Sequence, residues 1–134
     1  MIFGIGTDLC DVGRIERALE RFGERFAGRI LVTSEMERFR RQRKPAGYLA
    51  KRFAAKEAFS KALGTGIRFP VNWHNVWVEN ERSGKPSLKF SRALAGLLKR
   101  RGIGNVYLSL TDEPGMACAF VVIEGNGRSV RGRK

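Results

Sequence analysis

The sequence predicts an α+β fold, from its composition and from two hydrophobic patterns. Of its 134 residues, 43% are hydrophobic, which suits one domain with a buried core. Some segments alternate apolar and polar residues, as strands do, and others repeat apolar residues every three or four positions, as amphipathic helices do. Because helices and strands do not alternate strictly, an α+β fold is favoured over a doubly wound α/β fold.

The first third of the chain predicts a strand followed by two helices. The strand covers residues 2–9. The helix over residues 12–26 has an apolar face, which consists of Val12, Ile15, Leu19, Phe22 and Phe26. Ser34 and Glu37 fit a capping box, which predicts a second helix that runs to about Lys44.

A longer helix and two short strands are expected next. Pro45 suits the first position of a helix, because its fixed φ is helical and its missing N–H is not needed there. This helix runs to about Leu63, where Gly64-Thr65-Gly66 ends it. Residues 73–79 and 87–90 have the pattern of strands.

The last third predicts one helix and a β-hairpin. Ser91 suits the N-cap of a helix over residues 92–101. Residues 105–111 and 116–123 are predicted strands, joined by the turn sequence Asp112-Glu113-Pro114-Gly115. We therefore expect residues 1–124 to form a single domain. Residues 125–134, rich in glycine and arginine, are expected to form a basic, disordered tail.

The composition limits the cellular setting and the partners. Lys and Arg number 26 against 13 Asp and Glu, which gives a formal net charge of +13 and favours polyanionic partners. No apolar run is long enough to span a membrane, and the first residues lack the pattern of a signal peptide, so we expect a cytoplasmic protein. Cys10 and Cys118 form no disulfide framework and are interpreted as small buried hydrophobic residues.

The first predicted helix separates its charges by sign. One face carries a set that we call the arginine stripe, namely Arg14, Arg17, Arg21 and Arg25. Like charges four residues apart repel, although pairs such as Arg21 with Glu24 recover part of that energy. The separation suggests docking of an acidic partner, and a solvated charged face is the alternative.

The helix over 45–63 carries charged residues beside its packing face. Leu49, Phe53, Glu57 and Lys61 fall on one stripe of that helix. A partly buried carboxylate at Glu57 needs a cation, which Lys61 could supply as an i,i+4 partner or a metal ion could supply with Asp8 as the second carboxylate. Mg²⁺ uses one or two carboxylates, waters and substrate phosphates, whereas zinc is disfavoured because His74 is the only histidine.

Two glycine-containing segments are candidate phosphate loops. Gly64-Thr65-Gly66 offers backbone N–H groups and a hydroxyl, although a plain helix stop is the commoner role of such a sequence. Gly84-Lys85-Pro86 is likewise most often a hairpin turn. Arg52 belongs to a second basic cluster that could hold phosphates, together with Arg38, Arg40, Arg41, Arg43, Lys44 and Lys51. His74, in the predicted strand 73–79, is interpreted as structural.

Taken in order, these motifs resemble one family. Gly6-Thr7-Asp8, then Arg52-Phe53-Ala54-Ala55-Lys56-Glu57-Ala58-Phe59-Ser60-Lys61-Ala62, then Gly64-Thr65-Gly66-Ile67 is similar to bacterial holo-[acyl-carrier-protein] synthase, the short class of 4′-phosphopantetheinyl transferase. The resemblance spans residues 1–124 and includes Gly84-Lys85-Pro86. It implies the fold of that family, a small antiparallel sheet packed with helices, and a homotrimer with coenzyme A bound between subunits.

The resemblance also implies a reaction and roles for residues. The serine of an apo acyl carrier protein attacks the β-phosphate of coenzyme A, phosphopantetheine is transferred and 3′,5′-ADP leaves, in support of fatty acid biosynthesis. Asp8 and Glu57 would hold Mg²⁺, and Lys61 would offset the charge of the pyrophosphate. The residues expected along the coenzyme are Arg52, Lys61, Gly64, Thr65, Gly66, Gly84, Lys85 and Pro86. The general base is left open between Glu57, a metal-bound water and a carboxylate of the partner.

The resemblance assigns the arginine stripe to the acidic carrier protein, and one segment departs from the family pattern. Many members carry a histidine where this chain has Thr111-Asp112-Glu113, so that role is not carried over. Two other functions compete with the enzyme. A small nucleic-acid-binding domain would explain the charge but shows no recognised motif, and a non-catalytic adaptor would explain the stripe but not Asp8, Glu57 and Lys61.

Overall fold

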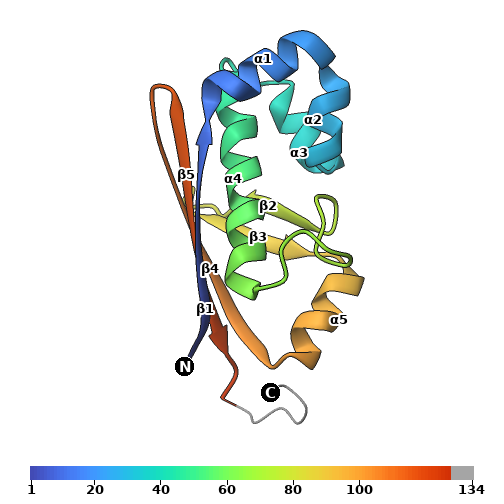
Figure 1. Cartoon of the computed structure of the whole chain (residues 1–134), viewed down its shortest axis with the longest axis vertical. Coiled ribbons are helices and arrows are strands. Elements are labelled where there is room, and N and C mark those ends of the chain that lie inside the picture. The colour runs from blue at the N-terminus through green and yellow to red at the C-terminus, as the bar shows by residue number, and fades with distance from the viewer. Residues whose placement is uncertain (128–134) are drawn as a thin grey trace.

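The computed structural model describes residues 1–127 and shows an α+β architecture in which one long helix lies against a three-stranded sheet (Figure 1). The elements in chain order are β1 (Ile2–Asp11), α1 (Val12–Phe22), α2 (Glu24–Ile30), α3 (Thr33–Phe39), α4 (Pro45–Leu63), β2 (Val76–Asn80), β3 (Pro86–Phe90), α5 (Arg92–Arg100), β4 (Ile103–Glu113) and β5 (Met116–Gly125). Of the predicted basic tail, residues 128–134 lie outside the described residues. Within residues 1–127, no helix has the length and apolar character needed to cross a membrane.

The larger sheet has the order β1-β5-β4 and is antiparallel throughout. Its strands are longer than predicted: β1 continues to Asp11, and β4 and β5 are joined at Pro114-Gly115, where Gly115 has a φ of 89°. The edge strand β1 pairs with β5 so that Asp8 lies opposite Ala119. A second, two-stranded sheet consists of β2 and β3.

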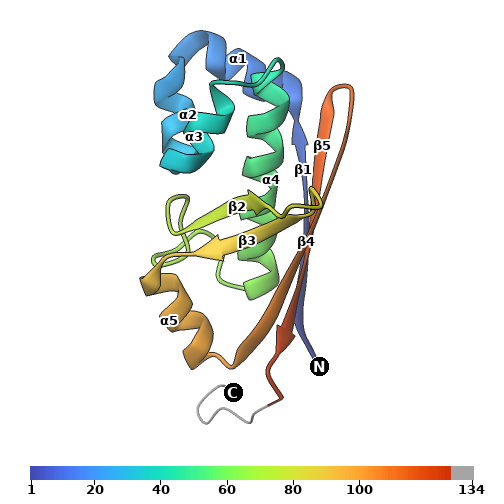
Figure 2. The ribbon, with the colours of Figure 1, turned by 180° about the vertical axis from the view of Figure 1, so that it is seen from behind.

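Helix α4 runs along one face of the larger sheet, with α1, α2 and α3 gathered beside its first half and the β2–β3 sheet crossing it (Figures 1 and 2). Glycines in β1 allow this close approach. A Cβ at Gly4 would collide with the carbonyl oxygen of Ala62, and a Cβ at Gly6 with that of Ala58. The alanines of α4 on this side are buried, so backbone meets backbone and β1 is held directly against the helix.

The predicted single helix over residues 12–26 is wrong. The structure has two helices, separated at Gly23, whose φ of 62° is a left-handed conformation that favours glycine. As a result the predicted apolar face is also divided: Ile15 is buried in the core, while Phe22 at the end of α1 is 54% exposed.

The predicted capping box at Ser34 and Glu37 is also wrong. Helix α3 begins at Thr33, and it ends at Phe39 rather than near Lys44. Its third residue, Glu35, accepts a hydrogen bond from the backbone N–H of Val32 at 3.0 Å. The sequence rule identified the helix start correctly but chose Glu37 instead of Glu35 as the residue that caps it. Glu35 is buried because its side chain bonds to residues distant in the sequence.

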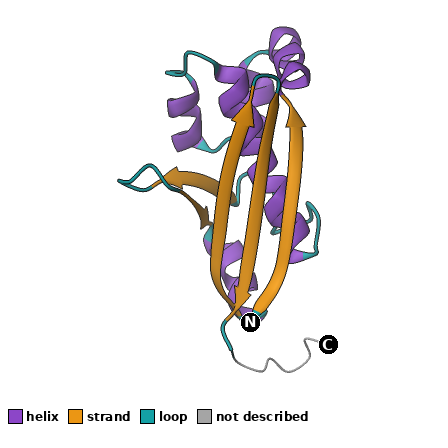
Figure 3. Ribbon diagram, turned by 90° about the vertical axis from the view of Figure 1, so that its left-hand side faces the viewer, coloured by secondary structure: helices purple, strands orange, loops and turns teal. Residues whose placement is uncertain are grey.

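The face of the larger sheet that points away from α4 has no element packed on it within residues 1–127 (Figure 3). Apolar side chains are exposed on all three of its strands, and they include Ile5, Leu9, Tyr107, Met116 and Phe120. Monomeric proteins rarely leave a contiguous apolar surface of this kind in water.

Candidate active site

The structure brings Asp8 and Lys61 together at the contact between β1 and α4. Lys61 Nζ lies 2.9 Å from Asp8 Oδ1 and 3.1 Å from the carbonyl oxygen of Thr7. The Asp8 side chain is only 14% exposed, whereas that of Lys61 is 54% exposed. The partner of Lys61 is therefore a strand residue and not Glu57, the i,i+4 partner considered from the sequence. Its ammonium group remains accessible from solvent.

Glu57 lies one turn before Lys61 on α4 and shares the electrostatic environment of Asp8. The pKa of the Glu57 carboxyl is raised, chiefly by its partial burial and then by the negative charge of Asp8, while Lys61 acts in the opposite direction. Two carboxylates and one ammonium group are thus close enough to influence one another. A carboxylate pair whose mutual repulsion is only partly offset is a site that favours a bound cation.

The donor set fits Mg²⁺. Asp8 and Glu57 supply hard oxygen ligands, and no group of three or more His, Cys, Asp or Glu residues within residues 1–127 is arranged to hold a metal ion. Mg²⁺ retains several waters and is commonly bound by one or two carboxylates together with substrate phosphates, so a larger protein cage is not required.

The two glycine segments adopt the conformations of a helix stop and of a hairpin turn. Gly64 ends α4 in the left-handed region with a φ of 85°, and the N–H groups of Gly64, Thr65 and Gly66 all point to the carbonyl oxygen of Ser60, at 3.1 to 3.3 Å. In the second segment, Gly84 N–H donates to Glu81 O at 2.8 Å in the hairpin turn between β2 and β3. Gly64-Thr65-Gly66 is therefore a helix stop, and its Gly66 also has a positive φ.

Arg52 is buried inside the protein, one turn before Lys56 on α4. It is 5% exposed, its guanidinium lies 4.0 Å from the centre of the Tyr48 ring, and its Nη2 donates to Asn80 Oδ1 at 3.2 Å. Its Nε atom has no hydrogen-bond partner in the described part of the chain. Direct contact between this side chain and a phosphate stays a prediction, and the small exposed area leaves little surface for it.

The arginine stripe is exposed but is interrupted by the break at Gly23. Arg14, Arg17 and Arg21 lie on α1, whereas Arg25 lies on α2. The expected pairing of Arg21 with Glu24 is wrong, because Glu24 forms an ion pair with Arg40 at 3.0 Å instead. Arg21 packs over the ring of Phe22, 5.2 Å from its centre.

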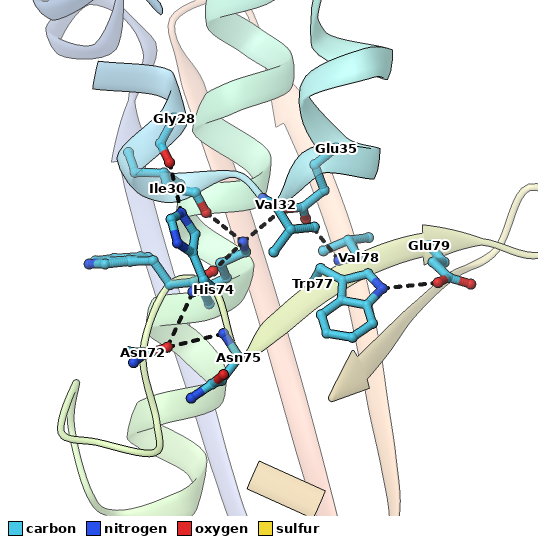
Figure 4. Close-up of polar contacts among 12 residues, drawn as sticks. Gly28, Ile30, Val32, Glu35, Asn72, His74, Asn75, Trp77, Val78 and Glu79 are labelled. Carbon is cyan, nitrogen blue, oxygen red and sulfur yellow. Dashed lines mark hydrogen bonds and ion pairs between the residues drawn. The ribbon is translucent and has the colours of Figure 1, made fainter. Parts of the chain in front are cut away.

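A buried ion pair that the sequence reasoning missed lies behind the site. Lys56 is completely buried, and its Nζ donates to Glu35 Oε1 at 2.7 Å, to the carbonyl of Trp73 at 2.8 Å and to that of Ile30. Glu35 Oε2 accepts from Val78 N–H at 2.9 Å. Figure 4 shows Ile30, Glu35 and Val78 of this cluster coming together from different elements. The available signal was a lysine placed among buried alanines in the middle of a helix.

The remaining candidate residues have structural roles. His74 lies in a turn before β2 rather than in the predicted strand, and its Nε2 is 2.7 Å from the carbonyl oxygen of Gly28 (Figure 4). Burial, followed by the charge of Asp8, raises the pKa of Cys10 to about 11, so its thiol stays protonated at neutral pH. Neither residue offers a nucleophile.

Comparison with known proteins places the chain in a family. A family model described as the 4′-phosphopantetheinyl transferase superfamily matches residues 4–119. The chain belongs to this superfamily. The holo-[acyl-carrier-protein] synthase of Nitrosomonas eutropha is 53% identical over 124 residues, which cover 92% of this chain and 99% of that protein. The family resemblance inferred from the motifs is thereby confirmed over nearly the whole chain.

Solved structures of the same family have the same fold. The crystal structure of holo-[acyl-carrier-protein] synthase from Neisseria meningitidis superposes with a TM-score of 0.89 at 49% identity and covers 92% of this chain and 99% of that one. The enzyme from Bacillus anthracis, in complex with coenzyme A (3′,5′-ADP), gives a TM-score of 0.79 at 36% identity, with coverage of 93% and 98%. The predicted α+β fold is therefore confirmed as well.

The buried ion pair gives a stability prediction. Lys56→Met should lower the free energy of unfolding by about 3–5 kcal/mol, because it leaves the charge of Glu35 buried without a counter-ion. The matched control is Lys51→Met on the same helix. Its pair with Asp112 is 3.6 Å long and partly exposed, so the change should stay below about 1 kcal/mol. Urea unfolding of both variants measures the difference; equal losses would contradict the assignment.

Proposed function

We propose that this protein transfers 4′-phosphopantetheine from coenzyme A to a serine of apo acyl carrier protein in a Mg²⁺-dependent reaction, releasing 3′,5′-ADP. The observation that carries the proposal is the meeting of Asp8, Glu57 and Lys61 at the β1–α4 contact, within a chain of this superfamily. The names of its relatives support the same reaction, as does the coenzyme bound to the Bacillus anthracis enzyme. A cytoplasmic role in fatty acid biosynthesis follows from this activity.

In this proposal the acidic residues of the site bind the metal ion, and its basic residue interacts with the phosphates. Asp8 and Glu57 would hold Mg²⁺, which when bound neutralises phosphate charge and polarises the phosphorus–oxygen bonds. Lys61 adds a positive charge that is preorganised by its bonds to Asp8 and Thr7, so charge that develops on the transferring phosphoryl group meets a donor already in place.

The proposed coenzyme site lies between two chains. Gly64, Thr65, Gly66, Gly84, Lys85 and Pro86 are assigned to its lining by their match to the family's motifs. The exposed apolar face of the β1-β5-β4 sheet supports a homotrimer, since burying it between copies removes apolar surface from water. The acidic carrier protein would dock on Arg14, Arg17, Arg21 and Arg25, which are carried by α1 and α2.

The activity is tested by mass spectrometry of the carrier. Incubation with apo acyl carrier protein, coenzyme A and Mg²⁺ should add the phosphopantetheine mass to the carrier serine, and EDTA should abolish the addition. Glu57→Gln should reduce the rate by at least about 100-fold, because a metal ligand is lost. Glu37→Gln, an exposed change on α3, is the control that should leave the rate unchanged. No mass shift with a competent carrier would refute the proposal.

The same Glu57→Gln variant should be more stable than the wild type in metal-free buffer at neutral pH. A carboxyl whose folded pKa is raised contributes stability that is fully present below its ordinary pKa and is lost as pH rises through the raised value. Glutamine does not ionise and avoids this loss. Thermal unfolding in EDTA gives the comparison, and a lower Tm would argue against repulsion between the two carboxylates.

The arginine stripe is tested by reversing two of its charges. Arg14→Glu combined with Arg21→Glu should raise the KM for the carrier roughly tenfold or more, because an electrostatic docking surface becomes repulsive. The KM for coenzyme A should stay nearly constant. The control combines Arg92→Glu with Arg100→Glu on α5, which changes the net charge equally on exposed residues of another helix. If both double variants raised the KM for the carrier equally, the arginine stripe would be a solvated charged face and not a docking surface.

The assembly is tested with Phe120→Lys at the centre of the exposed sheet face. Phe120 is 41% exposed and lies on the middle strand β5, so a charge there should prevent burial of the face. Light scattering should give three times the 15.0 kDa mass of one chain for the wild type and a smaller species for the variant. Phe22→Lys, on α1, should remain trimeric. A monomeric wild type would contradict the trimer.

A further inference from the structure

The side chain of Asn80, the last residue of β2, connects α4 to the turn between β2 and β3 through two hydrogen bonds. Its Oδ1 accepts a hydrogen bond from Arg52 Nη2 at 3.2 Å, and its Nδ2 donates to the carbonyl oxygen of Gly84 at 3.0 Å. Arginine only donates and a carbonyl only accepts, so the linking side chain must present one acceptor and one donor at once. An amide side chain meets that requirement, whereas a carboxylate or an alkyl group of the same size does not.

The α4 end of this connection is rigidly held. Arg52 is 5% exposed and stacks on Tyr48, which is itself 7% exposed and donates its hydroxyl to Glu35 O at 3.2 Å. Since the Nε atom of Arg52 has no partner among residues 1–127, the bond to Asn80 is an important part of what satisfies this buried cation. Glu57 and Lys61 follow on the same helix, so the anchor and the catalytic cluster form one rigid body.

The other end of the connection is the exposed turn. Gly84 has a φ of 92°, Glu81 N–H donates to Lys85 O at 2.8 Å, and Lys85 N–H lies 3.3 Å from Ser83 Oγ. The hydrogen bond from Asn80 fixes the Gly84 carbonyl and with it the peptide plane shared with Lys85. Without this bond, the plane depends on the long 3.3 Å contact between Lys85 N–H and Ser83 Oγ, so the exposed glycine turn rotates it at a lower energetic cost.

We propose that Asn80 is a positioning residue: it links Arg52 on α4 to the Gly84-Lys85 peptide and so holds this turn in the conformation that binds the coenzyme. The inference rests on the proposed function, because that function assigns Gly84 and Lys85 to the coenzyme site. It gives Arg52 an indirect role there, in place of the direct phosphate contact predicted from the sequence. Pre-ordering of a binding turn raises affinity because the ordering is not required again when the ligand binds.

The test is Asn80→Asp, which is nearly isosteric and separates the two bonds. Aspartate still accepts from Arg52, now with an opposite charge, but it has no donor for Gly84 O. We expect the Tm to equal or exceed that of the wild type, while the KM for coenzyme A rises about fivefold to tenfold. The kcat and the KM for the carrier should change less than twofold.

Two more variants distinguish loss of the hydrogen bond to Gly84 from the added negative charge. Asn80→Leu breaks both bonds without adding charge, so it should raise the KM for coenzyme A to a similar extent but also lower the Tm. Ser87→Ala removes a hydrogen bond in the same hairpin, from Ser87 Oγ to Glu79 O at 3.3 Å, and should leave the KM unchanged. A rise confined to Asn80→Asp would indicate charge repulsion and would overturn the inference.

Hydrogen exchange and the wild-type assay separate the possible failures. Amides of residues 81–85 should exchange faster in Asn80→Asp than in the wild type, in the absence of any substrate. If the wild type transfers phosphopantetheine and Asn80→Asp keeps its KM for coenzyme A, the inference is overturned and the proposed function stands. If the wild type does not transfer, the proposed function itself fails, and the coenzyme role of Asn80 fails with it.

Discussion

The buried ion pair between Lys56 and Glu35 is the interaction on which the arrangement around the site depends. Lys56 joins the end of α2 through Ile30, the start of α3 through Glu35 and the segment before β2 through Trp73, all from the middle of α4. A fully buried ammonium group is tolerated only when acceptors receive its hydrogen bonds and a carboxylate balances its charge. The three segments that supply these groups must therefore pack around Lys56 together. The geometry of α4 and that of the layer beside it are therefore coupled.

On the opposite side of α4, the contact with β1 has a different physical basis. Gly4 and Gly6 remove the side chains that would separate the strand from the helix, and buried alanines on α4 complete the fit. This close approach sets Asp8 within 2.9 Å of Lys61, although 53 positions separate them in the sequence. The same contact places the carboxylates of Asp8 and Glu57 near each other, and their repulsion, after burial, raises the pKa of Glu57.

The two contacts together explain how one helix can belong to the core and also carry the residues of the candidate site. Side chains on its inner faces are held by packing and by satisfied polar groups, whereas Lys61 near its end remains accessible. Arg52 extends the same principle to the β2–β3 turn through Asn80. Side chains attached to a rigid element in this way are held in place more precisely than side chains on loops.

The sequence alone determined the α+β class, the bounds of α4, the Ser91 cap and the family, because these depend on local periodicity, end signals and motif order. Only the tertiary structure decided that Gly23 divides the first helix, that Glu24 pairs with Arg40 and that Lys61 pairs with Asp8. It also decided that Lys56 and Arg52 are buried. Partners of charged side chains are chosen by proximity between elements far apart in the chain, and local patterns do not carry that information.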